Sequence, residues 1–346
     1  MSKLVSLDCH ITEEATRWQT AVSSFPHPSV LDSPQWCQLI QDFYRFPSWT
    51  WLSADSDQAQ GLSTLYRVSS FLLGDRLINS PFFGTSGFHF KDPATLQLLL
   101  NAGVDLGRER DVDFIEIRSR TPLPEPFQHD NTFALFDLSL DQDIDDIWHN
   151  RLSSNVRQNI RRSAKNAYRF ESNTDPEIAH AVLARTLRIH GTPFHGKTFF
   201  QRIRDRLGDQ VSFSCVEKAG KPVAAALVIW DEHSMSTPYI GSLEPDRSEG
   251  VGYFQYWELI KEGVRRGKTK FEFGRSPRKS THASYKKKWG AGEIPLFHNY
   301  LLIGSGTRYR TVGNPSKLEL TATKLWSHLP LILTRYLGPG LQHHIA

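Results

Sequence analysis

The sequence has few sulfur-containing residues and no long apolar run. It holds 3 cysteines and 2 methionines among 346 residues. Cys9, Cys37 and Cys215 are odd in number and far apart, which excludes a disulfide framework and a four-thiolate zinc site. No run approaches the ~18 apolar residues that a membrane-spanning helix needs, and the first residues have no apolar signal core. We therefore expect a cytoplasmic protein without a transmembrane segment.

Acidic residues are missing from two long stretches, although the net charge is only +4. One stretch runs over 147–170 and the other over 274–292. Their cations are Arg151, Arg157, Arg161, Arg162, Lys165 and Arg169 in the first, and Arg275, Arg278, Lys279, Lys286, Lys287 and Lys288 in the second. Two such patches indicate phosphate-bearing partners such as tRNA. The alternative is two solvated faces.

Several catalytic and binding signatures are also missing. The histidines show no H-x-x-x-H or H-E-x-x-H spacing, so we predict no metal. There is no G-x-S-x-G sequence and no Cys-His pattern for nucleophilic catalysis. No helix-turn-helix or zinc-finger signature appears, so we predict no DNA binding.

What is present indicates a folded protein of about two domains. Hydrophobic residues make up 39% of the chain and aromatic residues 12%, which is enough to form a core. A domain usually has ~100–200 residues. In the first half we expect helices over 12–24, 34–45 and 93–109, and strands over 48–54, 61–79, 113–118 and 132–138. This mixed order predicts an α/β (α+β) fold, and we interpret 141–168 as hinge helices between two domains.

The second half repeats strands and helices in a more informative order. We expect helices over 176–190 and 196–207, and then strands over 211–215, 223–230 and 234–240. A polar loop, 244–252, follows the last of these strands. Tyr253, Trp257, Ile260 and Val264 recur at helix spacing after it. Strands over 271–273 and 296–303 complete the order.

The loop before that helix has the sequence R-x-x-G-x-G, from Arg247 to Gly252. Glycines let successive backbone N–H groups converge, and the start of a helix adds unpaired N–H donors and positive potential. Such a loop suits a pyrophosphate, and Arg247 would add a charge-assisted hydrogen bond. The pattern is short enough to occur in an ordinary surface turn, but its place between strand and helix favours the binding site.

This strand–loop–helix–strand order resembles the acyl-CoA-binding segment of the GNAT N-acyltransferases. More of the chain resembles their FemAB-like, tandem-GNAT branch, as found in bacterial exopolysaccharide and protein-sorting clusters. The stretches that carry the resemblance are Asn79–Phe83, Asp113–Arg118, Leu152–Arg157, Ile160–Lys165, His190–Pro193, Tyr256–Leu259, Phe273–Ser276, Lys286–Gly290, Trp326–Pro330 and Leu337–Pro339. The segment Pro277–Ser284 lacks the glycine that relatives carry there.

The resemblance implies tandem GNAT-like domains, each a mixed sheet flanked by helices. We expect an N-terminal domain over 1–150, whose cofactor site is degenerate because it lacks the R-x-x-G-x-G loop. A C-terminal domain over 151–310 would bind the acyl donor through Arg247, Gly250, Val251 and Gly252. The rest, 311–346, is an apolar and basic helical tail that packs on the body, with peripheral membrane contact as the alternative.

The implied reaction is direct attack of an amine on an acyl donor, without a covalent enzyme intermediate. The candidate general bases are Glu272, on the strand after the cofactor helix, and His190 and His195, which bracket a Gly-Thr-Pro loop. The candidate substrate-binding residues are Thr192, Arg275, Tyr285 and Lys286. Each also has a plain structural interpretation, as an ion-paired strand carboxylate, a loop cap or a solvated cation.

Three functions remain open at this stage. The first is acyl-CoA-dependent N-acylation of an amino sugar, an amino acid or a cell-envelope precursor, as in polysaccharide biosynthesis. The second is aminoacyl-tRNA-dependent transfer, which the two basic patches would serve. The third is a GNAT-like protein that binds without catalysis.

Overall fold

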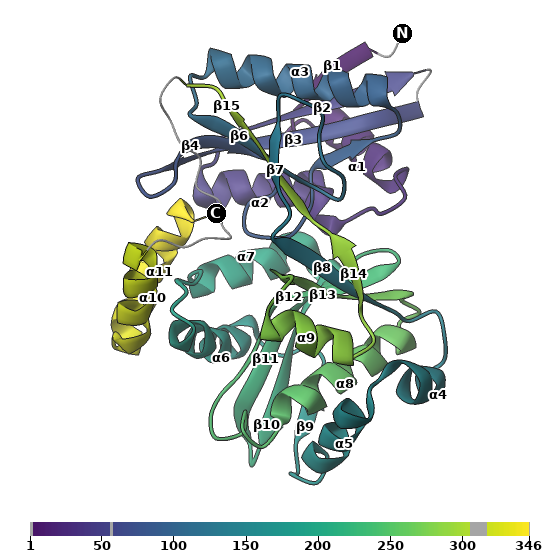
Figure 1. Ribbon diagram of the computed structural model, residues 1–346, viewed down its shortest axis with the longest axis vertical. Coiled ribbons are helices and arrows are strands. Elements are labelled where there is room, and N and C mark those ends of the chain that lie inside the picture. Colours follow the sequence, from purple (N-terminus) through teal and green to yellow (C-terminus); the bar gives the residue numbers. More distant parts are fainter. Residues whose placement is uncertain (1–2, 56–57, 305–316, 346) are drawn as a thin grey trace. The chain divides into compact units, whose positions relative to one another are not determined.

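The computed structural model describes residues 3–55, 58–304 and 317–345. It divides into two compact units, each with its own sheet (Figure 1). Unit 1 comprises residues 1–133, 295–313 and 343–346, and unit 2 comprises 134–294 and 314–342. The expected domain limit at residue 150 therefore falls inside unit 2, and the chain returns to unit 1 after unit 2. The expected limit at 310 and residues 311–316 of the tail lie outside the described residues.

Unit 1 contains an eight-stranded sheet. The strands are β1 (Lys3–Leu7), β2 (Ser48–Asp55), β3 (Gln58–Ser70), β4 (Gly74–Ile78), β5 (Phe88–Phe90), β6 (Phe114–Ser119), β7 (Gln128–Asp130) and β15 (Phe297–Leu302). They are ordered β1-β2-β3-β4-β6-β15-β7, and β5 pairs with β3. Only the β4–β6 pairing is parallel among those that the structure describes in this sheet, with Arg76–Ile78 opposite Phe114–Glu116. The helices are α1 (Thr12–Ser23), α2 (Pro34–Tyr44) and α3 (Pro93–Glu109).

Helix α3 connects the two parallel strands and packs against the sheet. Its start is defined by local sequence, because Asp92 accepts a hydrogen bond from the Thr95 N–H and Pro93 occupies the first helical position. Leu100 of α3 packs with Leu77 of β4 in one buried cluster of the sheet. The helix begins and ends where its sequence pattern predicts.

Unit 2 contains a seven-stranded sheet, ordered β14-β8-β13-β12-β11-β10-β9. The strands are β8 (Phe133–Ser139), β9 (Arg169–Glu171), β10 (Val211–Lys218), β11 (Lys221–Trp230), β12 (Ser234–Ser242), β13 (Lys270–Pro277) and β14 (Gly292–Pro295). The helices are α4 (Ile144–Asp146), α5 (Ser154–Ser163), α6 (Pro176–Ile189), α7 (Lys197–Leu207), α8 (Val251–Arg265), α9 (Thr281–Lys288), α10 (Lys317–His328) and α11 (Leu331–His344).

Helices cover both faces of this second sheet. On β10, Phe213 contacts Phe200 of α7. The preceding Ser212 points to the opposite face and accepts a hydrogen bond from Trp230, which packs in the cluster that includes α8. Because adjacent strand residues alternate between faces, α6 and α7 lie on one face and α5 and α8 on the other. The buried run of β11 is thus covered on both sides, as its sequence predicts.

The interpretation of 141–168 as hinge helices is wrong. Ile147, Leu152, Val156 and Ile160 from this stretch are all buried in the main core cluster of unit 2. Apolar residues at helix spacing bury against the nearest sheet, and here that sheet belongs to unit 2. The mixed α/β fold class is confirmed.

Candidate active site

The two parallel strands of unit 2 diverge where their pairing ends. β12 and β13 pair only over Ser234–Ser236 and Lys270–Glu272. β12 then continues to Ser242 alongside β11, and β13 continues to Pro277. We call the unpaired portions, 237–242 and 273–277, the divergent edge. Strand edges of this kind present backbone N–H and C=O groups to a ligand.

The glycine loop leads from the divergent edge into α8. Gly250 is the N-cap residue, with a left-handed φ of 89°, and no side chain caps the helix. The first turn of α8 contains no acidic residue. The Val251 N–H donates to the Asp246 carbonyl at 3.1 Å, whereas a Cβ atom added at Gly252 would meet nothing within 4 Å. The start of α8 therefore has positive potential and open space beside it.

Both positively and negatively charged side chains surround this loop. Arg247 lies 3.5 Å from Glu244, so the predicted phosphate ligand is already ion-paired within its own loop. Lys218 of β10 contacts Glu249 at 2.5 Å and Asp246 at 3.2 Å. Nη2 of Arg162, on α5, lies 3.8 Å from the position of a Cβ atom at Gly250. Arg162 thus adds a cation at the start of α8.

Lys286 is the most unusual cation of the site. Its ammonium group, on α9, donates to the carbonyls of Gly274 at 2.9 Å and Arg275 at 3.1 Å, both on the divergent edge. The side chain is buried, and within the described residues no carboxylate lies at ion-pair distance from it. Burial lowers the pKa of Lys286 to about 7, and the charge of Asp137 opposes this only in part. Lys286 can therefore take up or release a proton near neutral pH.

A buried histidine from the loop after α6 contacts a half-buried tyrosine on the other strand of the edge. The His195 Nε2 atom lies 2.7 Å from the hydroxyl of Tyr239, on β12. Burial lowers the pKa of His195 to about 3, so the imidazole is neutral at physiological pH. Burial also raises the pKa of Tyr239, and the positive charge of Arg275 opposes that rise. Arg275 of β13 and Tyr239 of β12 are therefore electrostatic neighbours.

His190 lies beside the glycine loop. It follows α6 and is exposed, and its pKa is lowered by burial first and then by the charges of Arg247 and His282. Residues from three elements of unit 2, the end of α6, the loop before α8 and the start of α9, are thus brought within electrostatic range. Of these, His282 was not predicted, because nothing in its local sequence distinguishes it from a surface helix residue.

The remaining predicted residues have clear structural partners. Glu272, a predicted base, lies 2.6 Å from Lys270, as an outward strand carboxylate would. Tyr285 belongs to an aromatic cluster, with its ring 5.5 Å from that of Tyr253 and 6.2 Å from that of Trp289.

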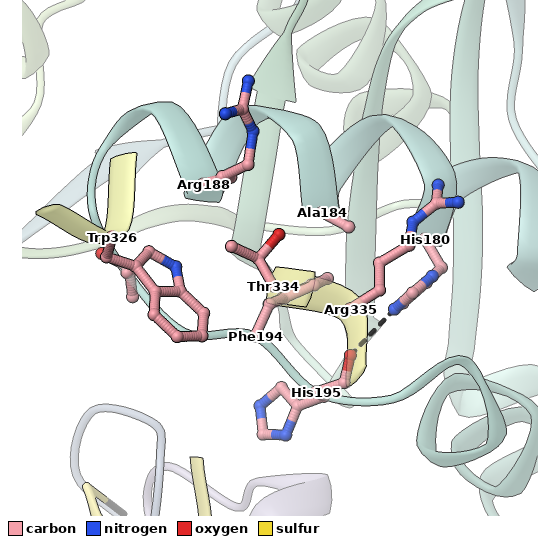
Figure 2. A pocket seen from close by; sticks show the side chains of 9 residues that line it. His180, Ala184, Arg188, Phe194, His195, Trp326, Thr334 and Arg335 are labelled. Carbon is pink, nitrogen blue, oxygen red and sulfur yellow. Dashed lines mark hydrogen bonds between the residues drawn. The ribbon is translucent and has the colours of Figure 1, made fainter. Parts of the chain in front are cut away.

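Thr192 lines a small cavity with His195, shown in Figure 2. The cavity is enclosed by α6, the loop after it, and the C-terminal helices. Beside it, His180 Nε2 donates a hydrogen bond to the His195 carbonyl oxygen at 2.8 Å. The volume is about 10 Å³, room for roughly one water molecule. This cavity is too small for an acceptor substrate, so the divergent edge is the better candidate.

Both basic patches are partly structural. Arg157 donates to the carbonyls of Trp148, His149 and Leu152, and Arg161 lies over the Trp148 ring. In the second patch, Arg278 and Lys287 both contact Glu293 at 2.6 Å, one residue beyond the acid-free stretch. Within the described residues, Arg162, Lys165 and Arg169 of the first patch are exposed and form no ion pair.

The sequence pattern that defines the acetyltransferase (GNAT) domain matches residues 150–287. This range contains the divergent edge, the glycine loop and Lys286. The match places an acetyltransferase (GNAT) domain in the part of the chain that holds the candidate site. Among the curated proteins, no sequence matches this chain.

Solved structures share the fold of the whole chain. The crystal structure of FemX superposes with a TM-score of 0.68 at 13% identity, over 87% of this chain and 98% of that one. A tandem GNAT protein from the clavulanic acid biosynthesis pathway gives a TM-score of 0.57 at 10% identity, over 89% and 100% of the two chains. The C-terminal domain of a putative lysylphosphatidylglycerol synthetase from Agrobacterium fabrum gives 0.55 at 13% identity, over 94% and 96%. The resemblance to FemAB-like tandem GNAT proteins is thereby confirmed in its fold.

None of the described helices is long and apolar enough to cross a membrane. The described residues also contain no group of three or more candidate metal ligands.

Proposed function

We propose that this protein transfers an acyl group from acyl-CoA to an amine by direct attack. The observation that carries the proposal is the divergent edge, which leads from the uncapped start of α8 to the amine of Lys286. The pantetheine arm of a CoA thioester is an extended chain with amide groups, and an open strand edge offers complementary hydrogen bonds. The pyrophosphate would lie at Arg247, Gly250, Val251 and Gly252.

The start of α8 suits a phosphate for reasons of charge and space. Gly250 leaves the first turn without a competing side chain, and Gly252 leaves room beside the N–H groups. Arg162 adds a second cation, from α5. Release of Arg247 from Glu244 costs little, because both side chains are about half exposed and the ion pair is weak in water.

Lys286 is the proposed proton carrier. The attacking nitrogen must lose a proton when it bonds to the acyl carbon, and the departing sulfur must gain one when the C–S bond breaks. A group whose pKa is about 7 can do both near neutral pH. Glu272 was predicted for this role, and its pairing with Lys270 favours Lys286 instead.

The acceptor site is proposed from residues around the same edge. Arg275 lies within electrostatic range of Tyr239, and His190 lies within electrostatic range of Arg247. A cation at this position suits an acceptor that carries a carboxylate or a phosphate, such as an amino acid, an amino-sugar phosphate or a cell-envelope precursor. Thr192 and Tyr285 remain predicted acceptor contacts.

An aminoacyl-tRNA donor is the second candidate, and two observations favour it. Glu244, Asp246 and Glu249 place three carboxylates in the glycine loop, which weakens its attraction for a pyrophosphate. Exposed cations without ion pairs, Arg162, Lys165 and Arg169, lie at and beyond the end of α5 and would suit a nucleic-acid backbone. The fold shared with FemX is compatible with either donor.

Thermal unfolding of the purified chain separates the two donors. Saturating acetyl-CoA, longer acyl-CoAs and bulk tRNA are each compared with buffer. A ligand at ~100 times its Kd adds about 2.7 kcal/mol to the free energy of unfolding. We expect stabilisation by CoA thioesters that Gly252→Phe abolishes. A shift with tRNA alone, lost as salt rises, would assign the aminoacyl donor, and no shift with any of them would contradict both.

A further inference from the structure

Helix α11 is inverted relative to an ordinary amphipathic helix. A surface helix normally buries its apolar stripe and exposes its polar one. In α11 the buried residues are Thr334, Gly338 and Gln342. Ile332 and Tyr336, by contrast, are 81% and 83% exposed. The apolar face of α11 therefore points away from unit 2.

Close packing fixes this orientation. A Cβ atom at Gly338 would lie 2.9 Å from the carbonyl oxygen of Phe194, closer than real Cβ atoms approach backbone. The neighbouring Pro339 packs against Gly196, 3.3 Å from a Cβ position there. Rotating α11 to bury Ile332 would bring a large side chain against the same backbone. The small residues are thus on the inside because only they fit.

Helix α10 is held to the same loop. Arg188, on α6, donates to the carbonyls of Ser327 at 3.0 Å and Leu329 at 2.9 Å, at the end of α10. Thr323 packs directly against Gly191, where a side chain would not fit. We call α10 and α11 together the C-terminal hairpin. Its inner side is a built contact with the loop over 190–196.

The outer side of α11 carries an apolar stripe. Ile332, Leu333, Tyr336 and Leu337 are all exposed, and their spacing places them on one helix face. Leu325 of α10 is 66% exposed. Single exposed apolar residues are ordinary, but a contiguous group of this kind marks an interaction surface.

Charge indicates what covers this surface. No acidic residue follows Glu319 in the sequence. Lys324 on α10 is exposed next to Leu325, whereas Arg335 lines the cavity with His180 on the inner side. Aliphatic side chains, a tyrosine and a flanking cation without acids match an anionic lipid interface, in which the apolar face enters the acyl-chain boundary and the cation meets headgroups.

We propose that the outer face of the C-terminal hairpin docks on the surface of a bilayer that contains anionic phospholipid. The helices lie in the interface and do not cross it. A groove in a partner protein would also bind the apolar stripe, but it would not require a surface without acidic residues. The proposal is independent of the acyl donor and of Lys286.

Docking would also orient unit 2. The inner side of the hairpin holds the loop over 190–196, and His190 at one end of that loop lies beside Arg247. A bilayer bound to the outer side therefore fixes the distance between the membrane surface and this loop. An acceptor presented at the membrane would meet the site in a defined orientation.

The first test is flotation of the full chain with vesicles. Phosphatidylcholine vesicles are compared with vesicles that also contain phosphatidylglycerol. The double variant Ile332→Ser/Tyr336→Ser should lower the partition coefficient about a hundredfold, roughly tenfold for each side chain. Lys324→Gln should lower it about fivefold, and only on anionic vesicles. Ile11→Ser, on unit 1, is the matched control, because Ile11 is also exposed, and it should change nothing.

A second test locates the contact. All three native cysteines are buried, so Tyr336→Cys can be labelled selectively with an environment-sensitive fluorophore. Its emission should shift to the blue with anionic vesicles. The same label at Asp205→Cys, on α7, should not shift.

Three results would overturn the proposal. One is a wild-type chain that fails to float with anionic vesicles. Another is a double variant that floats as well as the wild type while its thermal unfolding is unchanged. The third is a dimer in sedimentation velocity that the double variant dissociates, which would assign the stripe to a second copy of the chain.

Discussion

The two units contain the same local arrangement with opposite outcomes. In each, a helix lies in the connection between two parallel strands: β4–β5–α3–β6 in unit 1, where β5 precedes the helix, and β12–α8–β13 in unit 2. In unit 1 the helix start is capped by the carboxylate of Asp92. In unit 2 the equivalent position is Gly250, which has no side chain. An anion can approach α8, whereas Asp92 already occupies the start of α3.

The parallel strands of the two units also differ where their pairing ends. Beyond the parallel pairing of unit 1, the Asn79 side chain accepts from the Arg118 N–H at 2.9 Å and donates to the Arg118 carbonyl at 3.0 Å. This bridge closes the space that the divergent edge leaves open in unit 2. It also gives a structural reason for the Asn79–Phe83 and Asp113–Arg118 motifs. The expectation that unit 1 has a degenerate cofactor site stays a prediction.

Buried cations complete the comparison. Arg118 in unit 1 donates to Glu116 at 2.8 Å, and Glu116 also contacts His298 at 2.9 Å. Burial alone raises the pKa of Glu116, but Arg118 and His298 outweigh it, so the carboxylate stays ionised. Within the described residues, Lys286 in unit 2 hydrogen-bonds to carbonyls and lies over the Phe136 ring, with no carboxylate at ion-pair distance. A neutralised cation stabilises a fold, whereas one without a carboxylate partner is available for chemistry.

The largest expected effect follows from removing the Lys286 amine. Lys286→Met should lower kcat a hundred- to ten-thousandfold, the range for loss of a proton-transfer group, with KM for the donor nearly unchanged. Steady-state kinetics with acetyl-CoA and a panel of amines measure this. Glu272→Gln is the matched variant and should retain most of the activity. The reverse result would identify Glu272 as the base.

The same substitution should stabilise the protein at neutral pH. The pKa of Lys286 is about 7 in the folded chain and 10.5 without burial. Between these values the unfolded chain binds more protons, so wild-type stability should rise as pH increases from 7 to 10.5 and stay flat below 7. Lys286→Met should be more stable by roughly 1–4 kcal/mol at pH 7, with a smaller gain at pH 10. An equal gain in the free energy of unfolding at both pH values would contradict the assignment of Lys286 as a buried cation.

Blocking the helix starts tests the comparison directly. Gly252→Phe should raise the Kd for acyl-CoA about a hundredfold, because the ring would cover the N–H groups that bind phosphate. It should leave thermal unfolding unchanged, since a side chain there meets no atom within 4 Å. Ala94→Phe is the counterpart at the second position of α3, also exposed. It should alter neither binding nor stability, and calorimetric titration would show any departure.

The bridge in unit 1 should matter for stability alone. Asn79→Ala removes three buried hydrogen bonds, to Ser86 and to both backbone groups of Arg118. We expect a loss of about 2–4 kcal/mol in the free energy of unfolding by urea, with kcat unchanged. A loss of activity without a loss of stability would show that unit 1 takes part in catalysis.

The smallest expected effect concerns the cap of α3. Asp92→Ala should cost about 1 kcal/mol, the usual value for an N-cap carboxylate. The pKa of the Asp92 carboxyl is lowered by the backbone N–H of Thr95 first and then by its hydroxyl. In the variant, the free energy of unfolding should therefore no longer depend on pH in the range where this carboxyl titrates. Urea unfolding over a pH series measures both.

Local signals in the sequence predicted much of this arrangement. Pro93 and Gly250 sit at helix starts, and apolar spacing predicted α3 and α8, because these features depend on neighbours in the chain. The burial of Lys286 could not be read in the same way. Three lysines stand together, and only packing decides that Lys286 points inward while Lys287 reaches Glu293. The spacing of Ala283, Lys286 and Trp289 was the available signal.

Contacts between segments that are distant in the chain could not be predicted from the sequence. His195 was chosen as a loop base, yet its partner Tyr239 lies 44 residues away. The acid-free stretch over 274–292 suggested a basic face, but Glu293 lies just past its end and neutralises two of its cations. The exposed apolar side of α11 was likewise hidden, since its composition alone fits a packed helix.

Strand β15 has a consequence for how the chain acquires its structure. It lies between β6 and β7 in the first sheet, although its residues follow nearly the whole of unit 2 in the chain. A nascent chain that ends at residue 133 therefore lacks the sixth strand of this sheet, and Glu116 lacks its partner His298. The sheet of unit 2 is synthesised in full before the sheet of unit 1 can be completed. The second sheet to be made is thus the first that can form completely, and truncation before residue 297 should leave the first sheet incomplete.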